Sequence, residues 1–262
     1  MFSNEQRCQY HKHQLVDVIC QLRFPDILTI NANQPADFQE AIRFAYPQFT
    51  AKIENPSPRI TDAVGNILPN NQQTNYNYQF ASADGTWRVN LTSRFISLAC
   101  SKYNLWEDFA KKLDIPLAAF IKIYSPSYFQ RIGLRYINFF SRENLGLEEF
   151  SFSQLFQPAY LGLLGDPDVA ERQISQSSIQ TECTINHGCR VKIHAGPGTV
   201  RQNGHTDGEV KFIFDQDLFM SGNIPVTYSA SALENLHSQA YPIFRGAITD
   251  SLHNALEPTP IH

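Results

Sequence analysis

A regular alternation of apolar and polar side chains marks a long strand in the middle of the chain. Its apolar side chains recur at every second position: Ile132, Leu134 and Tyr136. Successive side chains of a strand point to opposite faces, so Arg131, Gly133 and Arg135 share the other face. Two guanidinium groups around a residue without a side chain need an anionic partner, which is either a carboxylate of the fold or a ligand.

The same pattern predicts most other elements of the first half. A strand is expected from Leu15 to Phe24, and a helix from about Pro35 to Tyr46. Three strands are expected at 76–82, 87–92 and 95–100, and Asp84-Gly85 is typical of the first hairpin turn. Residues 55–75 contain three prolines and a glycine, which indicates a surface loop or a ragged hairpin.

Proline residues interrupt both long helical patterns. A helix is expected from about Asn104, with an interruption at Pro116 and a second piece at 117–124. At the C-terminal end, apolar residues at helical spacing predict one helix from about Ala230 to Leu256. Pro242 is expected to kink it.

The second half contains weaker strand patterns. Residues 151–164 indicate a short helix with a loop, and 170–185 a long polar strand that turns at Asn186-His187-Gly188. Strands are expected at 189–195 and 209–214. One loop bounded by Gly196-Pro197-Gly198 and Asn203-Gly204 is expected, because glycine, proline and asparagine favour turns.

These elements predict an α+β fold of two similar halves. Each half has an antiparallel sheet with a long helix packed on it, as in a helix-grip or TATA-binding-protein-like duplication. The chain 1–262 would form a single compact domain of two repeats, approximately 14–125 and 130–256. The echo of Leu22-Arg23-Phe24 in Leu134-Arg135-Tyr136 supports this interpretation; a chance resemblance of two halves is the alternative.

Composition restricts the class of protein. The 262 residues include 42% hydrophobic and 12% aromatic side chains, enough for a large core. A net charge of −4 does not favour a general nucleic-acid or membrane-surface binder, although a local basic patch would be compatible with it. Five unpatterned cysteines, no apolar signal segment and no membrane-length apolar run predict a cytoplasmic protein with reduced thiols.

The candidate ligand site is a set of three arginines on the polar strand face. Arg23 is expected at a place equivalent to Arg135, with Arg131 nearby, and together they could bind a phosphate or carboxylate. The alternative is an internal salt-bridge network with Asp17, Glu182, Glu209 or Asp215. The sequence favours that alternative, since structural ion pairs are the commoner use of such residues.

Metal, cofactor and catalytic signatures are weak or missing in the sequence. Zinc-type residues surround one hairpin at an unusual spacing: Cys183, His187, Cys189 and His194. Asp215 and Asp217 share one strand face and could hold magnesium, but are more typical of a strand end. No phosphate-binding loop, dinucleotide fingerprint or nucleophile elbow occurs, so no cofactor is predicted. The residues His237, Tyr103 and Trp106 are interpreted as structural.

The segment 131–138, together with 35–43 and Tyr46-Pro47, resembles an uncharacterised family of bacterial proteins of about this length. The strand around Trp87 and the spacing Tyr103-x-x-Trp106-x-x-Phe109 are also similar to that family. The resemblance implies a sporadic distribution, as for an accessory gene in a defence or toxin–antitoxin module. It supplies no activity and no catalytic residues.

The sequence therefore favours a non-enzymatic binding or adaptor protein that acts through its sheet or helix face. A protein partner or a homo-oligomer is expected, no membrane association, and nucleic acid is not favoured. The alternative function is a sensor or enzyme for a phosphorylated ligand or nucleic acid, with Arg23, Arg131 and Arg135 as the anion clamp.

Overall fold

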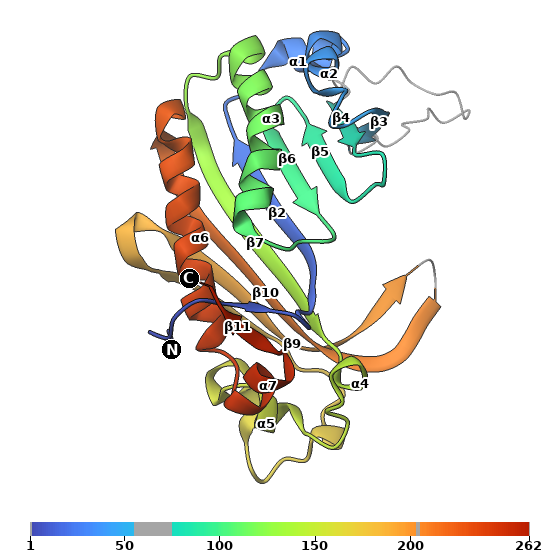
Figure 1. Cartoon of the computed structure of the whole chain (residues 1–262), viewed down its shortest axis with the longest axis vertical. Coiled ribbons are helices and arrows are strands. Elements are labelled where there is room, and N and C mark those ends of the chain that lie inside the picture. Colours follow the sequence, from blue (N-terminus) through green and yellow to red (C-terminus); the bar gives the residue numbers. More distant parts are fainter. Residues whose placement is uncertain (1, 55–74, 203–204, 262) are drawn as a thin grey trace, which may run out of the picture.

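The computed structural model describes residues 2–54, 75–202 and 205–261 (Figure 1). Its centre is one nine-stranded antiparallel sheet in the order β3-β4-β5-β6-β2-β7-β10-β9-β8. The strands are β2 (Leu15–Arg23), β3 (Gln48–Glu54), β4 (Asn75–Ala81), β5 (Trp87–Leu91), β6 (Phe95–Cys100), β7 (Phe129–Phe140), β8 (Ile179–Thr184), β9 (Arg190–Gln202) and β10 (His205–Ile224).

Two long helices cover one face of this sheet, α3 (Trp106–Tyr124) and α6 (Ser229–Arg245) (Figure 1). The shorter helices are α1 (Leu28–Ala32), α2 (Ala36–Ile42), α4 (Arg142–Leu145), α5 (Phe152–Leu155) and α7 (Asp250–Ala255). Short 3-10 turns occur at 158–160, 162–165, 171–173, 186–188 and 226–228. The sheet therefore has one helix-covered face and one open face.

The two ends of the chain pair with each other. Strand β1 (Cys8–Tyr10) and strand β11 (Pro258–Pro260) form a separate two-stranded antiparallel ribbon. The ribbon crosses the sheet beside α6 (Figure 1). Residues 250 positions apart thus close one end of the layer between sheet and helices.

The alternation in β7 determines which of its side chains are buried. Ile132, Leu134 and Tyr136 lie beneath the helices and are at most 5% exposed, as the pattern predicted. Phe109 and Phe120 of α3 are fully buried on the same side. Burying large aromatic and aliphatic groups supplies the main stabilisation of this layer.

The predicted architecture of two halves, each with its own sheet and long helix, is wrong. Strands β2 and β7 pair directly from Leu15 to Arg23, so the hydrogen-bond ladder continues across the middle of the chain. The fold is α+β, but one nine-stranded sheet with few helices dominates it. Local alternation identifies strands but contains no information on which strands become neighbours.

Pro116 does not interrupt α3, contrary to the expectation of two helical pieces. A proline inside a helix leaves the carbonyl four residues earlier without its N–H donor. That carbonyl belongs to Lys112, and the hydroxyl of the buried Tyr46 donates to it at 2.7 Å. A long-range hydrogen bond therefore replaces the missing helical one.

The expected C-terminal helix over 230–256 is instead two helices. Helix α6 ends at Arg245, and Thr249 caps α7 by accepting a hydrogen bond from the backbone of Leu252. The link between them pairs with the segment after α5, since Ile248 forms a bridge with Phe156. Tertiary pairing thus overrides the helical spacing of the apolar residues.

Other local predictions had mixed outcomes. The turn at Asp84-Gly85 is confirmed, with Gly85 at φ 71°. The long polar strand over 170–185 is wrong, because β8 begins only at Ile179. The loop expected between 196 and 204 is wrong over 196–202, which lie inside β9. The segment expected as a loop at 55–75 and the residues 203–204 fall almost entirely outside the described residues.

All five cysteines are free thiols, and Cys20, Cys100 and Cys189 are buried. Among the described residues, no helix combines the length and the hydropathy that crossing a membrane requires.

Candidate functional site

Two places in the fold gather polar side chains, and the first is the open face of the sheet. Arg131 and Arg135 of β7 lie on this face, as the alternation predicted. Arg23 of β2 pairs in register with Arg131, so the structure brings all three predicted arginines onto one face of adjacent strands.

Arg131 forms an ion pair with Asp217 of the neighbouring strand β10. Its Nη2 donates to both carboxylate oxygens at 2.7 Å. The guanidinium carbon also lies 4.6 Å from the ring centre of Phe219. A Cβ added to Gly133 would come within 2.2 Å of Nη1 of Arg131. The missing side chain of Gly133 therefore leaves space for Arg131 to extend diagonally across the two strands to Asp217.

Arg135 forms a bidentate ion pair with Asp215. Its Nε donates to Oδ1 at 2.8 Å, its Nη2 donates to Oδ2, and these hydrogen bonds raise the pKa of Arg135. Asp215 was among the internal partners expected from the sequence, whereas Asp217 was not. Two of the three arginines therefore have internal carboxylate partners, and anion binding by Arg23, Arg131 and Arg135 stays a prediction.

A hollow of about 310 Å³ opens beside Arg135 on this face. It is lined by Arg135, Gln180, Lys192, His194, Asp215 and Asp217. Both aspartates are paired with arginines, so their negative charge is largely neutralised and they are already engaged against a cation. No group of three or more metal-ligating side chains assembles among the described residues, at Cys183–His194 or elsewhere.

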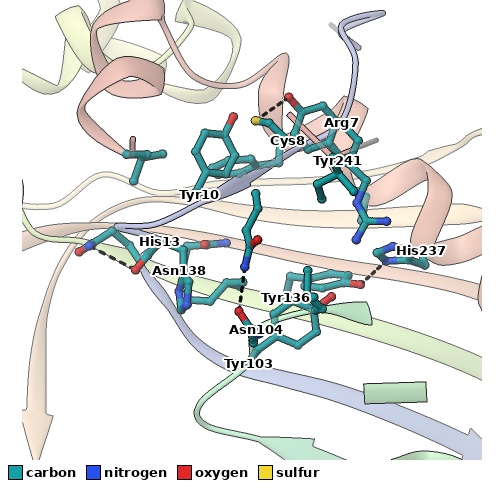
Figure 2. A pocket seen from close by; sticks show the side chains of 18 of the residues that line it. Arg7, Cys8, Tyr10, His13, Tyr103, Asn104, Tyr136, Asn138, His237 and Tyr241 are labelled. Atoms are coloured by element: carbon teal, nitrogen blue, oxygen red, sulfur yellow. Dashed lines mark hydrogen bonds between the residues drawn. The ribbon is translucent and has the colours of Figure 1, made fainter. Parts of the chain in front are cut away.

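The second place is a cavity of about 110 Å³ on the helix-covered side, between the sheet, α6 and the terminal ribbon (Figure 2). Rings of Tyr10, Tyr103, Tyr136, Tyr241 and Phe244 line it. The polar lining residues include Arg7, Gln9, His13, Gln14, Asn104, Asn138, Gln216 and His237. Segments from both ends and from the middle of the chain are needed to build it.

Two carboxamides and a phenol from the neighbouring strands β7 and β10 form the buried floor of the cavity. Gln216 is 3% exposed and pairs in register with Tyr136. Asn138 lies two residues after Tyr136 in β7, on the same face. Asn138 donates to the carbonyl of Phe214 at 3.3 Å. The side-chain oxygen of Gln216 is buried and has no hydrogen-bond partner within the described part of the chain.

His237 of α6 forms one wall and is uncharged at neutral pH. Burial, helped by the nearby positive charge of Arg7, lowers the pKa of His237 to about 3. Its Nδ1 is 2.8 Å from the hydroxyl of Tyr136, and its ring stacks on Trp106 at 4.5 Å between ring centres. Trp106 in turn donates to Glu234 at 2.7 Å. These contacts hold the imidazole in one orientation.

The terminal segments form the opposite side and the mouth of the cavity. The hydroxyl of Tyr10 is 2.9 Å from Nδ1 of His253, and Sγ of Cys8 is 3.3 Å from the hydroxyl of Tyr241 (Figure 2 shows the second contact). Gln9 donates to Asn104 at 2.8 Å across the mouth. The ribbon is therefore held in place by side-chain bonds to α6 and α7.

The tyrosines of the cavity remain protonated. Burial raises the pKa of Tyr103 to about 12, and burial together with Cys8 raises that of Tyr241 to about 12. Burial also raises the pKa of Tyr136 well above its usual value. Apart from Arg7, the lining therefore offers neutral hydrogen-bonding groups and aromatic rings.

Sequence reasoning did not identify this cavity. Its clearest signal is the alternation Phe212, Phe214, Gln216, Leu218, in which a glutamine occupies a position that faces the core. His237, Tyr103 and Trp106 were interpreted as structural, and they do pack together. The N-terminal segment gave no strand signal, because its pairing partner lies at the far end of the chain.

No protein-family model and no curated protein matches this chain. The family resemblance inferred from the residues 131–138 therefore stays a prediction.

Proposed function

We propose that this chain is a non-enzymatic binding protein whose ligand is a small molecule held in the cavity beneath α6. The observation that carries the proposal is the cavity itself, which has aromatic walls and a buried polar floor. Ligand sites are typically concave, mostly apolar and furnished with a few convergent polar groups. A buried hydrogen-bonding group that the fold leaves unsatisfied also costs stability, which a ligand can recover.

The open-face hollow is larger, but it supports ligand binding less well. Arg135 and Asp217 of its lining are partly exposed, with side-chain exposures of 45% and 29%, and both aspartates are already paired with arginines. Ion pairs in contact with solvent are screened and contribute little. In the cavity, by contrast, polar groups are shielded from water, so each hydrogen bond counts for more.

Nothing in the cavity suggests covalent chemistry. Cys8 is the nearest thiol, and its contact is the neutral phenol of Tyr241 rather than a base. His237 is neutral, and its hydrogen-bond partner is the phenol of Tyr136. It is therefore not placed as a base between a nucleophile and an acidic group. This arrangement supports binding rather than turnover. A role as an adaptor in an accessory or defence system, with a protein partner or a second copy, remains a further prediction.

Small aromatic probes test the proposal directly. Indole or the single-ring pyrrole, titrated into the purified chain by calorimetry or NMR, should bind with a Kd on the order of 0.1–1 mM. Ala240 lies on α6 and lines the cavity, so Ala240→Phe should fill part of it. We expect this variant to weaken probe binding by at least about thirtyfold.

The matched control is Ala230→Phe, the same substitution at an exposed position of the same helix. It should leave the Kd unchanged. Thermal melts of both variants show whether they fold, and Gln9→Trp at the cavity mouth blocks entry without altering the core. Absence of saturable binding to the native chain, or binding that neither Ala240→Phe nor Gln9→Trp weakens, would refute the proposal.

A further inference from the structure

We infer that the cavity selects a neutral, planar heteroaromatic ring that donates an N–H hydrogen bond to the side-chain oxygen of Gln216. This inference rests on the proposed function and specifies its ligand. It depends on the hydrogen-bonding inventory of the floor, the shape of the walls and the charge of the lining.

The floor requires a donor from the ligand. The Gln216 oxygen is an acceptor, is buried and has no partner within the described residues. Its strand neighbours do not satisfy it, because Phe214 and Leu218 are apolar on the same face. The oxygen exposes almost no surface in this structure, so the carboxamide must turn about its terminal, soft torsion to present it to the cavity. A ligand N–H about 2.9 Å from the turned oxygen would then complete it.

The walls favour a flat ring. Rings of Tyr103 and Tyr136 meet edge to face, with centres 5.9 Å apart and an interplanar angle of 88°. Tyr10 meets Phe244 in the same manner at 5.6 Å and 79° on the other side. Flat surfaces at several orientations offer both stacked and edge contacts to an aromatic guest.

The lining favours an uncharged guest. His237 is neutral, the tyrosines are protonated, and the buried polar groups are carboxamides. Arg7 is the charged residue among the described residues of the lining, and its side chain is 35% exposed, with a guanidinium nitrogen 3.9 Å from a carboxylate oxygen of Glu107. A buried ligand charge would lack a partner on the floor, and burying an unpaired charge is costly.

Two pairs of near-isosteric probes isolate the N–H donor. Indole differs from benzofuran, and pyrrole from furan, mainly by an N–H in place of an ether oxygen. In the native chain, the N–H member of each pair that fits should bind about tenfold more tightly, because only it pairs with Gln216.

Gln216→Met removes the acceptor while nearly preserving shape. In this variant the N–H and oxygen members should bind equally, with benzofuran or furan binding at least as tightly as before. Folding should not suffer, since replacing an unpaired buried polar group by an apolar one is neutral or stabilising. The control is Gln21→Met, because Gln21 lies in β2 on the open face of the sheet, away from the cavity. This variant should retain the tenfold preference.

The outcomes separate this inference from the function on which it rests. Equal binding of both members to the native chain, or a preference that persists in Gln216→Met, overturns the N–H donor inference while the binding function stands. If no probe binds, or if binding is indifferent to Ala240→Phe and Gln9→Trp, the binding function itself fails.

Discussion

Lowering the pH from 7.5 to 5 should destabilise the native chain by about 2 kcal/mol through His237 alone. The pKa of His237 is lowered from 6.5 to about 3 in the folded protein, chiefly by burial. Below pH 6.5 His237 binds a proton in the unfolded chain but stays unprotonated in the folded chain. Stability is therefore full above the unfolded pKa and is lost as the pH falls toward the folded one.

The measurement is the free energy of unfolding in urea at several pH values from 7.5 to 5. In His237→Asn, which retains a hydrogen-bonding group near Nδ1, the loss over this range should shrink by about 2 kcal/mol. Burial also lowers the pKa values of His13 and His253, so a smaller slope of the same sign should remain. A slope that His237→Asn leaves unchanged would contradict the neutral imidazole.

Removing the hydroxyl of Tyr46 should cost about 1–3 kcal/mol of stability. In Tyr46→Phe the carbonyl of Lys112 loses its donor, and Pro116 cannot replace it. The carbonyl then stays unpaired beside a buried ring. Urea or thermal unfolding of the variant measures the loss.

A double-mutant cycle with Pro116→Ala identifies the cause. An alanine at 116 restores the backbone N–H, so Tyr46→Phe should cost distinctly less in that background. Tyr160→Phe is the matched control, because the hydroxyl of Tyr160 is buried without a partner in the described part of the chain and its removal should not destabilise. An equal cost of Tyr46→Phe in both backgrounds would disprove the carbonyl-rescue explanation.

The local parts of the fold could be predicted from the sequence because they depend on periodicity. The alternation in β7 and β2 gave both strands and the correct open-face placement of Arg131 and Arg135. What failed depends on contacts between distant segments. The continuity of α3 through Pro116 requires Tyr46, and the end of α6 requires the pairing of Ile248 with Phe156.

The predictability of the two candidate sites differed for the same reason. The face on which the arginines lie follows from the alternation of side chains within each strand. Asp215, with which Arg135 forms its ion pair, was also among the internal partners expected from the sequence. The cavity is built by β1, β7, β10 and α6, whose proximity no local pattern encodes. Gln216 at a core-facing position was its one visible trace.

The two faces of the sheet differ in how their polar side chains are paired. On the open face, Gly133 lets Arg131 reach Asp217, and the charges largely neutralise one another. On the covered face, the side-chain oxygen of Gln216 is buried beside an aromatic cavity and has no hydrogen-bond partner among the described residues. A polar group left unsatisfied in a well-packed layer is the kind of defect that function explains.

The most direct test is a crystal structure of the native chain soaked with indole or pyrrole, whichever binds more tightly. We expect the ring to lie in the cavity beneath α6, with its nitrogen about 2.8–3.2 Å from the side-chain oxygen of Gln216. A ring bound instead in the open-face hollow beside Arg135, or one in the cavity with its nitrogen turned away from Gln216, would contradict this expectation.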